Sequence, residues 1–511
     1  MRVTLLARSL LVLLALVAGT AFAQETFRIA IGVDPDTLDP VQGTTTTVDN
    51  IVDYVAETLV AIDKDGKLTP ALATSWQTDP DGLGITFTLR QDVTFHDGTP
   101  FDATAAQWNL ERLLDPDVRV PRRGTFTAIE SVEVTGPHTI HLSLNAPAPY
   151  LTGALAMTTA AFISPASINL EGNSYQNITH PVGTGPYVFD SRQLGESIQM
   201  TRYEDYWGEP PYYQHVLFRI VPEATTRESL LLAGQADLII LLPTSDIPAL
   251  QANPRTKVVL GPSDRTIFIA INTQKPILND KRVRQALNYA VDKQAIIQGI
   301  LFGAAQVMDA PMAPSLFGYQ PIGTYEYDPE RARQLLAEAG VEPGSLTLDF
   351  MSPTGRYVQD FAASQAIANY LRDVGINAVV RTMDWPTYIG TMTKPLEENT
   401  TQLHLLGWAP AFLDAAQQME QFESSRHPPA GLATSFYTNP EVDRLIEQAG
   451  QETNPDKRQD LYAQASRIIW DDAPWIFLWV QSFPMVHSSK VTNIWGLPNE
   501  KFYAIYAHPT E

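Results

Sequence analysis

The histidines are the first side chains to test for catalysis or metal binding, because imidazole serves both roles near neutral pH. His138 and His141 are three residues apart, but the segment between them reads as a strand, so their rings should face opposite sides. His96 and Asp97 could form an acid–base pair, yet with Gly98 they are more typical of a polar turn that ends a hairpin. The nine histidines include no HExxH motif, and they predict neither a metal site nor a catalytic pair.

Other catalytic motifs are also missing from the sequence. The chain has no cysteine, which excludes disulfides, thiol nucleophiles and cysteine-based metal sites. It has no G-x-S-x-G elbow and no kinase motif, and the glycines around Thr184 precede Pro186 rather than the Lys-Ser/Thr of a phosphate loop. The 57 acidic residues leave room for a glycosidase-type carboxylate pair, but no position marks one. We therefore expect no catalytic residues, no metal and no cofactor.

The N-terminus indicates secretion. Arg2 and Arg8 flank the start of an apolar stretch at residues 10–18, and Ala21-Phe22-Ala23 has the form that signal peptidase cleaves. The stretch is shorter than the roughly 20 residues of a membrane-spanning helix, which disfavours a retained anchor. Because no cysteine is available for lipid attachment, we expect the mature chain, starting at Gln24, to be free in the periplasm.

The charge of the chain restricts its partners. The formal net charge of −22 becomes more negative once Arg2 and Arg8 are removed. Such a surface repels nucleic acid and anionic membranes, so neither is an expected partner. The charge says little about a small ligand, because a cleft can differ in sign from the average surface.

The predicted secondary structure, which would position any site, differs between the first and second halves of the chain. Within residues 59–180, short strands and turns dominate; Ile85, Phe87 and Leu89 alternate with polar residues, and Asp102 predicts a helix N-cap. Thr225 and Glu228 have the spacing of a capping box. Beyond residue 267, strands alternate with helices, among them one at 358–373 with Phe361 on its apolar side. This alternation indicates an α/β lobe with a mixed sheet.

Five stretches, in this order, carry a resemblance to a known family. They are PDTLDP at 35–40, the run 76–113 with FHDGTPF at its centre, PVGTGPY at 181–187, TTRESLLLAGQADLI at 225–239, and FIAINTQKPILNDKRVRQALNYAVDKQAI at 268–296. The chain resembles solute-binding protein family 5, the extracytoplasmic binding proteins of peptide-, nickel- and opine-type ABC importers. The resemblance is co-linear over essentially the whole mature chain, which is more specific than any one motif.

The resemblance implies a two-lobed α/β periplasmic binding protein of the large peptide-binding type (type II, cluster C), with mixed sheets and an extra hairpin-rich subdomain. The expected division is a signal peptide at 1–23, first-lobe segments at 24–58 and 181–270, the inserted subdomain at 59–180, the second lobe at 271–485, and a return to the first lobe at 486–511. Crossovers between the lobes are expected near 268–272 and 482–488.

The resemblance also indicates which segments face the cleft between the lobes. These are residues 34–40, 183–187, 272–273, 354–357, 384–388 and 406–419. Within them, the candidate ligand-binding residues are Asp36, Thr184, Asn272, Arg356, Tyr357, Trp385, Trp408 and Asp414.

Three of these candidates have an alternative structural explanation. Arg356 stands at a strand-to-helix junction, where it would either pair bidentately with a ligand carboxylate or form a salt bridge with Asp360. Trp385 and Trp408 lie near strand ends, where each is either an aromatic wall of the site or ordinary core.

Residues 407–417 depart from the family pattern. Peptide-binding relatives carry an acid in this loop that holds the amino group of the peptide, but this chain has Ala411 where the acid is common. Asp414 is the nearest remaining acid. Because a buried ammonium without a carboxylate partner is costly, the ligand is either a peptide held through Asp414 or a solute without an ammonium.

Three functions compete for this sequence. The favoured one is a monomeric, non-enzymatic periplasmic protein that delivers a peptide-like or other small solute to an ABC permease, the alternative solutes being an opine, a saccharide or a metal chelate. A secreted hydrolase is disfavoured because no nucleophile or metal set is present. A structural or chaperone-like protein is disfavoured by the long co-linear resemblance.

Overall fold

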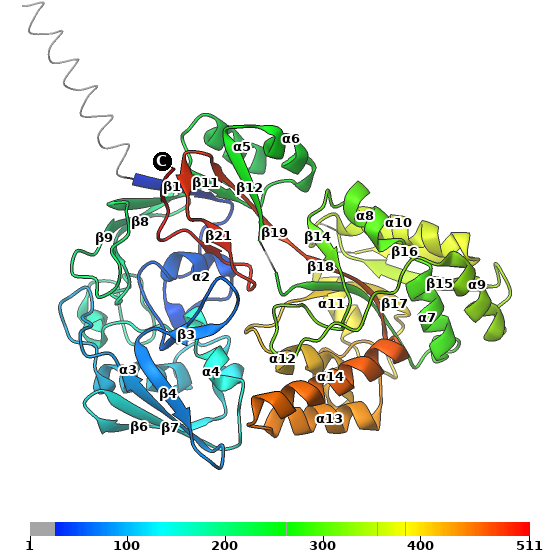
Figure 1. Ribbon diagram of the computed structural model, residues 1–511, viewed down its shortest axis with the longest axis horizontal. Coiled ribbons are helices and arrows are strands. Elements are labelled where there is room, and N and C mark those ends of the chain that lie inside the picture. Colours follow the sequence, from blue (N-terminus) through cyan, green and yellow to red (C-terminus); the bar gives the residue numbers. More distant parts are fainter. Residues whose placement is uncertain (1–25, 262, 355, 384, 511) are drawn as a thin grey trace, which may run out of the picture.

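Two large sheets, one at the centre of each lobe, organise the chain (Figure 1). The computed structural model describes residues 26–510, except 262, 355 and 384. The seven-stranded sheet has the order β12-β19-β11-β1-β10-β9-β8, and the six-stranded sheet has the order β14-β18-β13-β17-β15-β16. Each sheet contains both parallel and antiparallel pairs, so the predicted mixed α/β class is confirmed.

The first lobe is built on the seven-stranded sheet, which is covered on both faces. Along β1, Phe27, Ile29 and Ile31 face one apolar cluster while Ala30 faces another, as the two-residue period of a strand requires. Helices α5 (Ala224–Leu232) and α6 (Ile247–Ala252) cover the second face. The strands are β1 (Thr26–Ile31), β8 (Tyr187–Gln193), β9 (Ser197–Arg202), β10 (His215–Ile220), β11 (Leu238–Ile240), β12 (Thr256–Gly261) and β19 (Phe483–Ser488).

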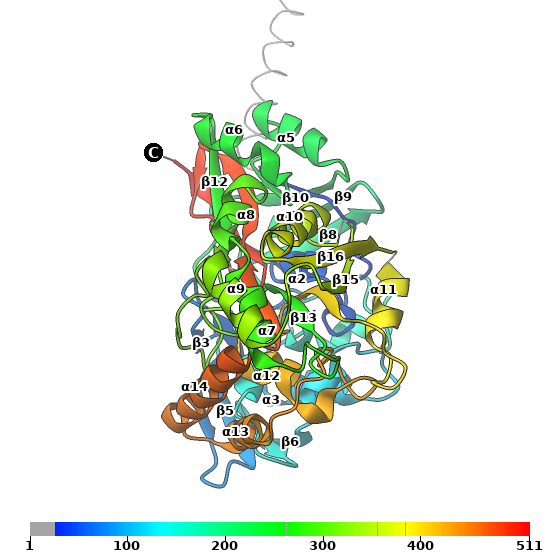
Figure 2. The ribbon, with the colours of Figure 1, turned by 90° about the vertical axis from the view of Figure 1, so that its right-hand side faces the viewer.

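The second lobe is built on the six-stranded sheet. All six residues of its strand β13 are buried, because Ile267, Ile269 and Ile271 face one apolar cluster and Phe268 and Ala270 face the other. Figure 2 looks onto the side covered by α7, α9 and α10. The strands are β13 (Thr266–Ile271), β14 (Ala305–Val307), β15 (Leu346–Ser352), β16 (Ile376–Thr382), β17 (Leu403–Trp408) and β18 (Trp475–Gln481). The helices include α7 (Lys281–Tyr289), α9 (Pro329–Glu338), α10 (Asp360–Asp373), α13 (Pro440–Gln451) and α14 (Pro455–Asp472). No helix in residues 26–510, as far as these are described, is long and apolar enough to cross a membrane.

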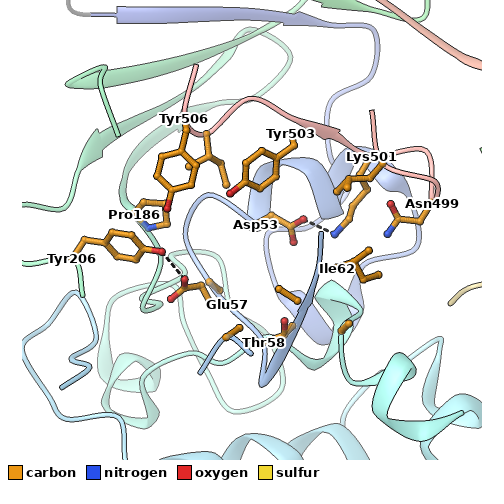
Figure 3. Close-up of a pocket in the computed structure, with 16 residues that line it drawn as sticks. Asp53, Glu57, Thr58, Ile62, Pro186, Tyr206, Asn499, Lys501, Tyr503 and Tyr506 are labelled. Atoms are coloured by element: carbon orange, nitrogen blue, oxygen red, sulfur yellow. Dashed lines mark hydrogen bonds and ion pairs between the residues drawn. The ribbon is translucent and has the colours of Figure 1, made fainter. Parts of the chain in front are cut away.

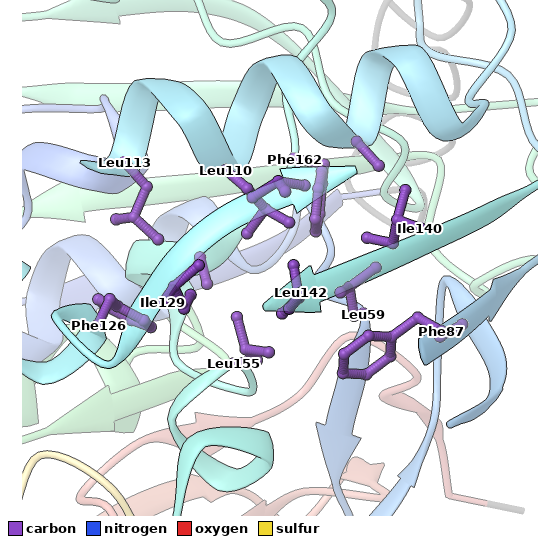
Figure 4. Close-up of a cluster of buried hydrophobic side chains, with 14 of the residues drawn as sticks. Leu59, Phe87, Leu110, Leu113, Phe126, Ile129, Ile140, Leu142, Leu155 and Phe162 are labelled. Atoms are coloured by element: carbon purple, nitrogen blue, oxygen red, sulfur yellow. The ribbon is translucent and has the colours of Figure 1, made fainter. Parts of the chain in front are cut away.

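A third, smaller sheet forms the hairpin-rich part of the chain. Its strands β4 (Ala73–Thr78), β5 (Gly84–Leu89), β7 (Thr139–Leu144) and β6 (Ile129–Gly136) pair in that order, and α3 (Ala103–Leu114) packs on them. Figure 4 shows Leu110 and Leu113 of α3 facing Ile140 and Leu142 of β7. The predicted alternation in β5 and the predicted N-cap at Asp102 are both confirmed.

The two lobes are joined by two neighbouring crossovers. Strand β12 leads into β13, while β18 leads back into β19, and the pairs β12–β19 and β13–β18 are antiparallel. The backbone N–H of Gln481 donates to the carbonyl of Arg265 at 2.9 Å, which ties the two crossovers together. Because Thr266 already pairs with Trp408 and Val480 of the second sheet, the first crossover precedes the expected position at 268–272.

Two local predictions were wrong. The capping box at Thr225 and Glu228 does not form: α5 begins at Ala224, and no side chain caps it. Helix α5 is instead tied to its surroundings by the buried side chain of Arg227, which donates to the carbonyls of Val221, Pro222, Ile240 and Leu241. Helix α10 begins at Asp360 rather than 358, and Phe361 is 37% exposed rather than part of its apolar side.

A buried ion pair joins α3 to the loop that follows β1. Arg112 donates to Asp39 at 3.0 and 2.5 Å and to the carbonyl of Tyr175 at 2.7 Å, and both charged side chains are almost fully buried. Asp39 also accepts from the backbone N–H of Ile178. The pair therefore fastens the inserted subdomain to the first lobe.

Replacing Arg112→Ala should lower the free energy of unfolding of the first lobe by about 3–5 kcal/mol, because it leaves Asp39 buried and unpaired. Urea unfolding followed by circular dichroism measures this change. Arg444→Ala is the matched control, because its pair with Glu441 is exposed on α13 and should contribute little. Equal midpoints for the two variants would contradict the assigned role of Arg112.

Candidate ligand-binding cleft

A cavity of about 630 Å³ lies between the two lobes. The first lobe lines it with residues 44–46 and 499–501 and with Asp49, Arg122, Met157 and Thr158. The crossover contributes Asp264 and Arg265, and the second lobe contributes Arg356, Tyr357, Trp385, Ile389, Met392, Leu432 and residues 406–411. The volume falls within the range of small-molecule sites, about 300–1,000 Å³.

An aromatic wall forms the second-lobe side of this cavity. The ring of Tyr357 meets that of Trp385 edge-on at 6.2 Å, and Trp385 stacks on Tyr388 at 5.5 Å. The hydroxyl of Tyr357 donates to the carbonyl of Gly407 at 3.1 Å, and that of Tyr388 donates to Leu405 at 2.6 Å. Strand β17 therefore holds the wall in place through its backbone carbonyls.

Gly407 allows this close packing. A Cβ added at Gly407 would lie 2.6 Å from a ring carbon of Tyr357 and 2.7 Å from Ile267, which is closer than side chains approach. The next residue, Trp408, is half-buried at the cavity, and its indole N–H has no hydrogen-bond partner within the described part of the chain.

Arg356 lies over the aromatic wall with its side chain exposed to the cavity. Its guanidinium carbon is 5.0 Å from the ring centre of Tyr357 and 5.2 Å from that of Trp385. The carboxylate of Asp360 accepts the backbone N–H groups of Arg356 and Tyr357, at 2.8 and 3.0 Å. Among the described residues, the Arg356 guanidinium forms no ion pair, so the salt bridge with Asp360 weighed from the sequence is not found.

Asp414 does not line this cavity. Both of its carboxylate oxygens accept from Arg458, at 2.7 and 2.6 Å, and one of them also caps α12 (Ala415–Met419). The pair borders a separate cavity of about 540 Å³ with Tyr150 and Phe317. The expectation that Asp414 replaces the missing acid conflicts with this geometry, because its oxygens are already used by Arg458.

The loop that departs from the family pattern contacts the first lobe. Phe412 is 4% exposed and stacks on Tyr150 at a ring-centre distance of 5.3 Å. It joins the apolar cluster of the inserted subdomain, and Ala411 packs against the same cluster. The apolar residues of this loop therefore form a contact between the lobes beside the cavity.

Asp36, Thr184 and Asn272, also named from the sequence, lie outside the cavity lining. Asp36 is exposed and accepts from the hydroxyl of Thr44. Asn272 is fully buried and donates to the carbonyl of Thr401 at 3.1 Å. Thr184 is also fully buried and donates to Glu57 at 2.9 Å. The candidate segments 354–357 and 384–388 each include one position, 355 and 384, outside the described residues.

The glycines beside Thr184 are needed for close approach rather than for unusual torsions. A Cβ at Gly183 would lie 2.0 Å from the carbonyl oxygen of Val55, and one at Gly185 would lie 2.7 Å from the Val55 carbonyl carbon. Neither glycine has a positive φ.

A smaller cavity of about 140 Å³ adjoins the first-lobe side (Figure 3). Tyr206, Trp207 and Thr184 all donate to the buried carboxylate of Glu57. Burial raises the pKa of Glu57 to about 7, although these hydrogen bonds oppose the shift. Because its oxygens already have donors within the fold, we interpret Glu57 as a structural group.

The prediction that His96 and Asp97 form a polar turn is confirmed. One ring nitrogen of His96 bonds the carbonyl of Gly185 at 2.8 Å, and Asp97 accepts from Ser164. Burial lowers the pKa of His96 to about 4, so the ring is neutral at pH 7. Within the described residues, no group of three His, Cys, Asp or Glu side chains could hold a metal ion.

Many residues of the cavity were missed from the sequence, among them Arg265, Glu500, Lys501 and the buried Asp264. Asp264 is 1% exposed, and neither of its carboxylate oxygens has a hydrogen-bond partner among the described residues. Its position directly before Arg265, at the start of a buried apolar strand, is the only sequence signal that sets it apart.

Comparisons with known proteins agree with this architecture. Residues 67–429 match the model of the bacterial extracellular solute-binding proteins, family 5. The glutathione-binding protein GsiB of Escherichia coli (strain K12) is 32% identical over 495 residues, which cover 96% of this chain and 95% of that protein.

Two solved structures are similar over nearly their whole length. HbpA2 from Haemophilus parasuis has a TM-score of 0.86 at 24% identity, covering 95% of this chain and 100% of that one. The periplasmic binding protein DppA from Helicobacter pylori, in complex with the peptide STSA, has a TM-score of 0.73 at 26% identity, covering 95% and 98%. The periplasmic-binding-protein fold expected from the sequence is thereby confirmed. The chain therefore belongs to family 5 of the bacterial extracellular solute-binding proteins, which serve ABC importers.

Proposed function

We propose that this protein captures glutathione or a similarly short, carboxylate-bearing peptide in the cavity between its lobes. The observation that carries this proposal is Arg356, whose guanidinium faces the cavity with no acidic partner among the described residues. A free carboxylate on the solute would form a charge-assisted and often bidentate pair with it. The full-length similarity to a glutathione-binding protein supports the same class of solute.

The aromatic wall suits the apolar part of such a solute. Beside Arg356, the cavity is lined by the aromatic rings of Tyr357, Trp385 and Trp408. Such rings bury a large apolar area and lose little conformational entropy when a ligand binds. An opine shares the carboxylate and is the second candidate. A saccharide or a metal chelate would leave Arg356 unmatched unless it too carried an anionic group.

The role in the cell follows from the family. The relatives described above are binding proteins, and we propose that this chain likewise binds its solute without catalysis and passes it to an ABC permease. The signal sequence at 1–23 would be removed on export, leaving a free periplasmic monomer. Rotation of the lobes about the paired crossovers would enclose and release the solute.

Isothermal titration of the mature protein with glutathione should give saturable binding at one site. Dipeptides, an opine, maltose and nickel–histidine serve as comparison solutes. The proposal would be contradicted if no carboxylate-bearing solute bound while an uncharged sugar bound tightly.

Arg356→Ala should weaken glutathione binding about 10- to 100-fold, because a hydrogen-bonded ion pair is lost. Arg372→Ala is the matched control, since Arg372 is exposed near the end of α10 and its guanidinium donates to Asn369 on the same helix. An affinity for Arg356→Ala equal to that of the control would remove Arg356 from the site.

Asp414→Asn should leave glutathione affinity nearly unchanged and lower the free energy of unfolding by about 3–5 kcal/mol, because Arg458 loses its buried partner. Titration calorimetry and thermal unfolding measure the two effects separately. A large loss of affinity without loss of stability would restore the role first expected for Asp414.

A further inference from the structure

The cavity of about 540 Å³ beside Asp414 is a second space between the inserted subdomain and the second lobe. On one side it is lined by the hairpin of β2 (Val60–Ile62) and β3 (Leu68–Pro70) and by α4 (Leu151–Ala154). On the other side it is lined by residues 315–317 and 413–414 and by the start of α14. Figure 1 shows β3 and α4 opposite α12 and α14 at this place.

This second cavity is distinct from the solute cavity. Among the described residues, the two have no lining residue in common. Residues 408–411 line the solute cavity, whereas Leu413 and Asp414 line the second one. Phe412, between these two stretches, is buried in the core of the inserted subdomain and stacks on Tyr150. A molecule in the second cavity would therefore occupy a site of its own.

The walls of the second cavity are large apolar side chains that the neighbouring cores leave partly uncovered. Ile62 and Tyr150 pack partly against the core of the inserted subdomain, and Phe317 and Leu413 pack partly against a core cluster of the second lobe. All four are only half-buried, and Leu68 is 38% exposed. Apolar surface gathered in a concave place is typical of ligand-binding sites, and apolar cavities take up apolar molecules more readily than water.

The charges beside the second cavity offer a ligand no free partner. Arg458 donates to both carboxylate oxygens of Asp414, and the two side chains are 4% and 10% exposed. Arg458 also donates to a backbone carbonyl and to a tyrosine hydroxyl within the second lobe. Asp65 and Lys67, on the hairpin, are exposed and opposite in sign, so they contribute little. Because a charged ligand would lose its hydration without gaining an ion pair, this cavity favours an uncharged one.

Two aromatic rings of the wall are fixed by their neighbours. Tyr150 is stacked with Phe412 at a ring-centre distance of 5.3 Å, and the guanidinium carbon of Arg458 lies 4.9 Å from the ring centre of Phe317. Rings held in this way can meet a flat ligand ring edge-on or in an offset stack.

We propose that the second cavity binds a small, uncharged aromatic molecule. The volume lies within the range of small-molecule sites, about 300–1,000 Å³. The bound molecule would contact both lobes, and the site does not depend on the solute proposed for the first cavity.

Indole is a suitable probe, because it is aromatic, uncharged and small. Titration calorimetry of the mature protein without glutathione should show saturable binding of indole at one site. Gly153→Leu should weaken this binding about 10-fold or more, because a Cβ at Gly153 meets no atom within 4 Å and the larger side chain would fill the cavity. Leu68→Asp should also weaken it, because it places a charge on the partly exposed wall.

Gly299→Leu is the matched control. Gly299 ends α8 (Lys293–Gly299) on the exposed surface of the second lobe, and a Cβ added there also meets no atom within 4 Å. This variant should bind indole as wild type does, and thermal unfolding without ligand checks that all three variants are folded. Benzoate and benzylammonium, which carry one charge on a single ring, should compete with indole about 10-fold more weakly than indole itself.

Three results would overturn the inference. The first is the absence of saturable indole binding, or equal binding by wild type, Gly153→Leu and Leu68→Asp. The second is displacement of indole by benzoate or benzylammonium at concentrations at which indole itself binds. The third is a loss of glutathione affinity in Gly153→Leu, which would make the two cavities one site. Failure of wild type to bind glutathione would contradict only the proposed function.

Discussion

The paired crossover is the constraint on which the remaining architecture depends. Two strands pass from one lobe to the other as antiparallel neighbours, with Gly261 opposite Phe483 and Gln481 bonded to Arg265. Each strand continues from one large sheet into the other, so this short ribbon joins the two lobes (Figure 1). The stacking of Phe412 on Tyr150 is a further contact between the lobes.

This geometry concentrates charge at the cavity. The C-terminal segment brings Glu500 and Lys501 to the crossover, where each finds an opposite charge. Ionised groups in a partly dry site are costly unless paired, so the protein satisfies most of them internally. Among the described charged residues that line the cavity, Arg356 and Asp264 form no ion pair. The strongly acidic surface gives no hint of this, because a net charge averages over many exposed carboxylates.

Local patterns predicted much of the fold, because short-range physics determines those elements. The alternation of β5 and the cap at Asp102 were predicted correctly for this reason. The capping box at Thr225 does not form because α5 begins at Ala224, which places Thr225 inside the helix rather than at its cap. Asp264 was missed because its burial comes from packing with a segment near residue 500, which no local pattern records.

The residues named from the family resemblance lie in different parts of the structure. Arg356, Tyr357, Trp385 and Trp408 all reach one cavity, whereas Asn272 and Thr184 bond within the fold. Asp414 was suggested by the missing acid at Ala411, and only the three-dimensional structure reveals Arg458 as its partner.

The most direct test of this account is to purify the protein from the periplasm, release its bound small molecules by unfolding, and identify them by mass spectrometry. The account predicts that these include a peptide-like molecule of modest size that carries a free carboxylate. An abundant neutral sugar in its place would contradict it.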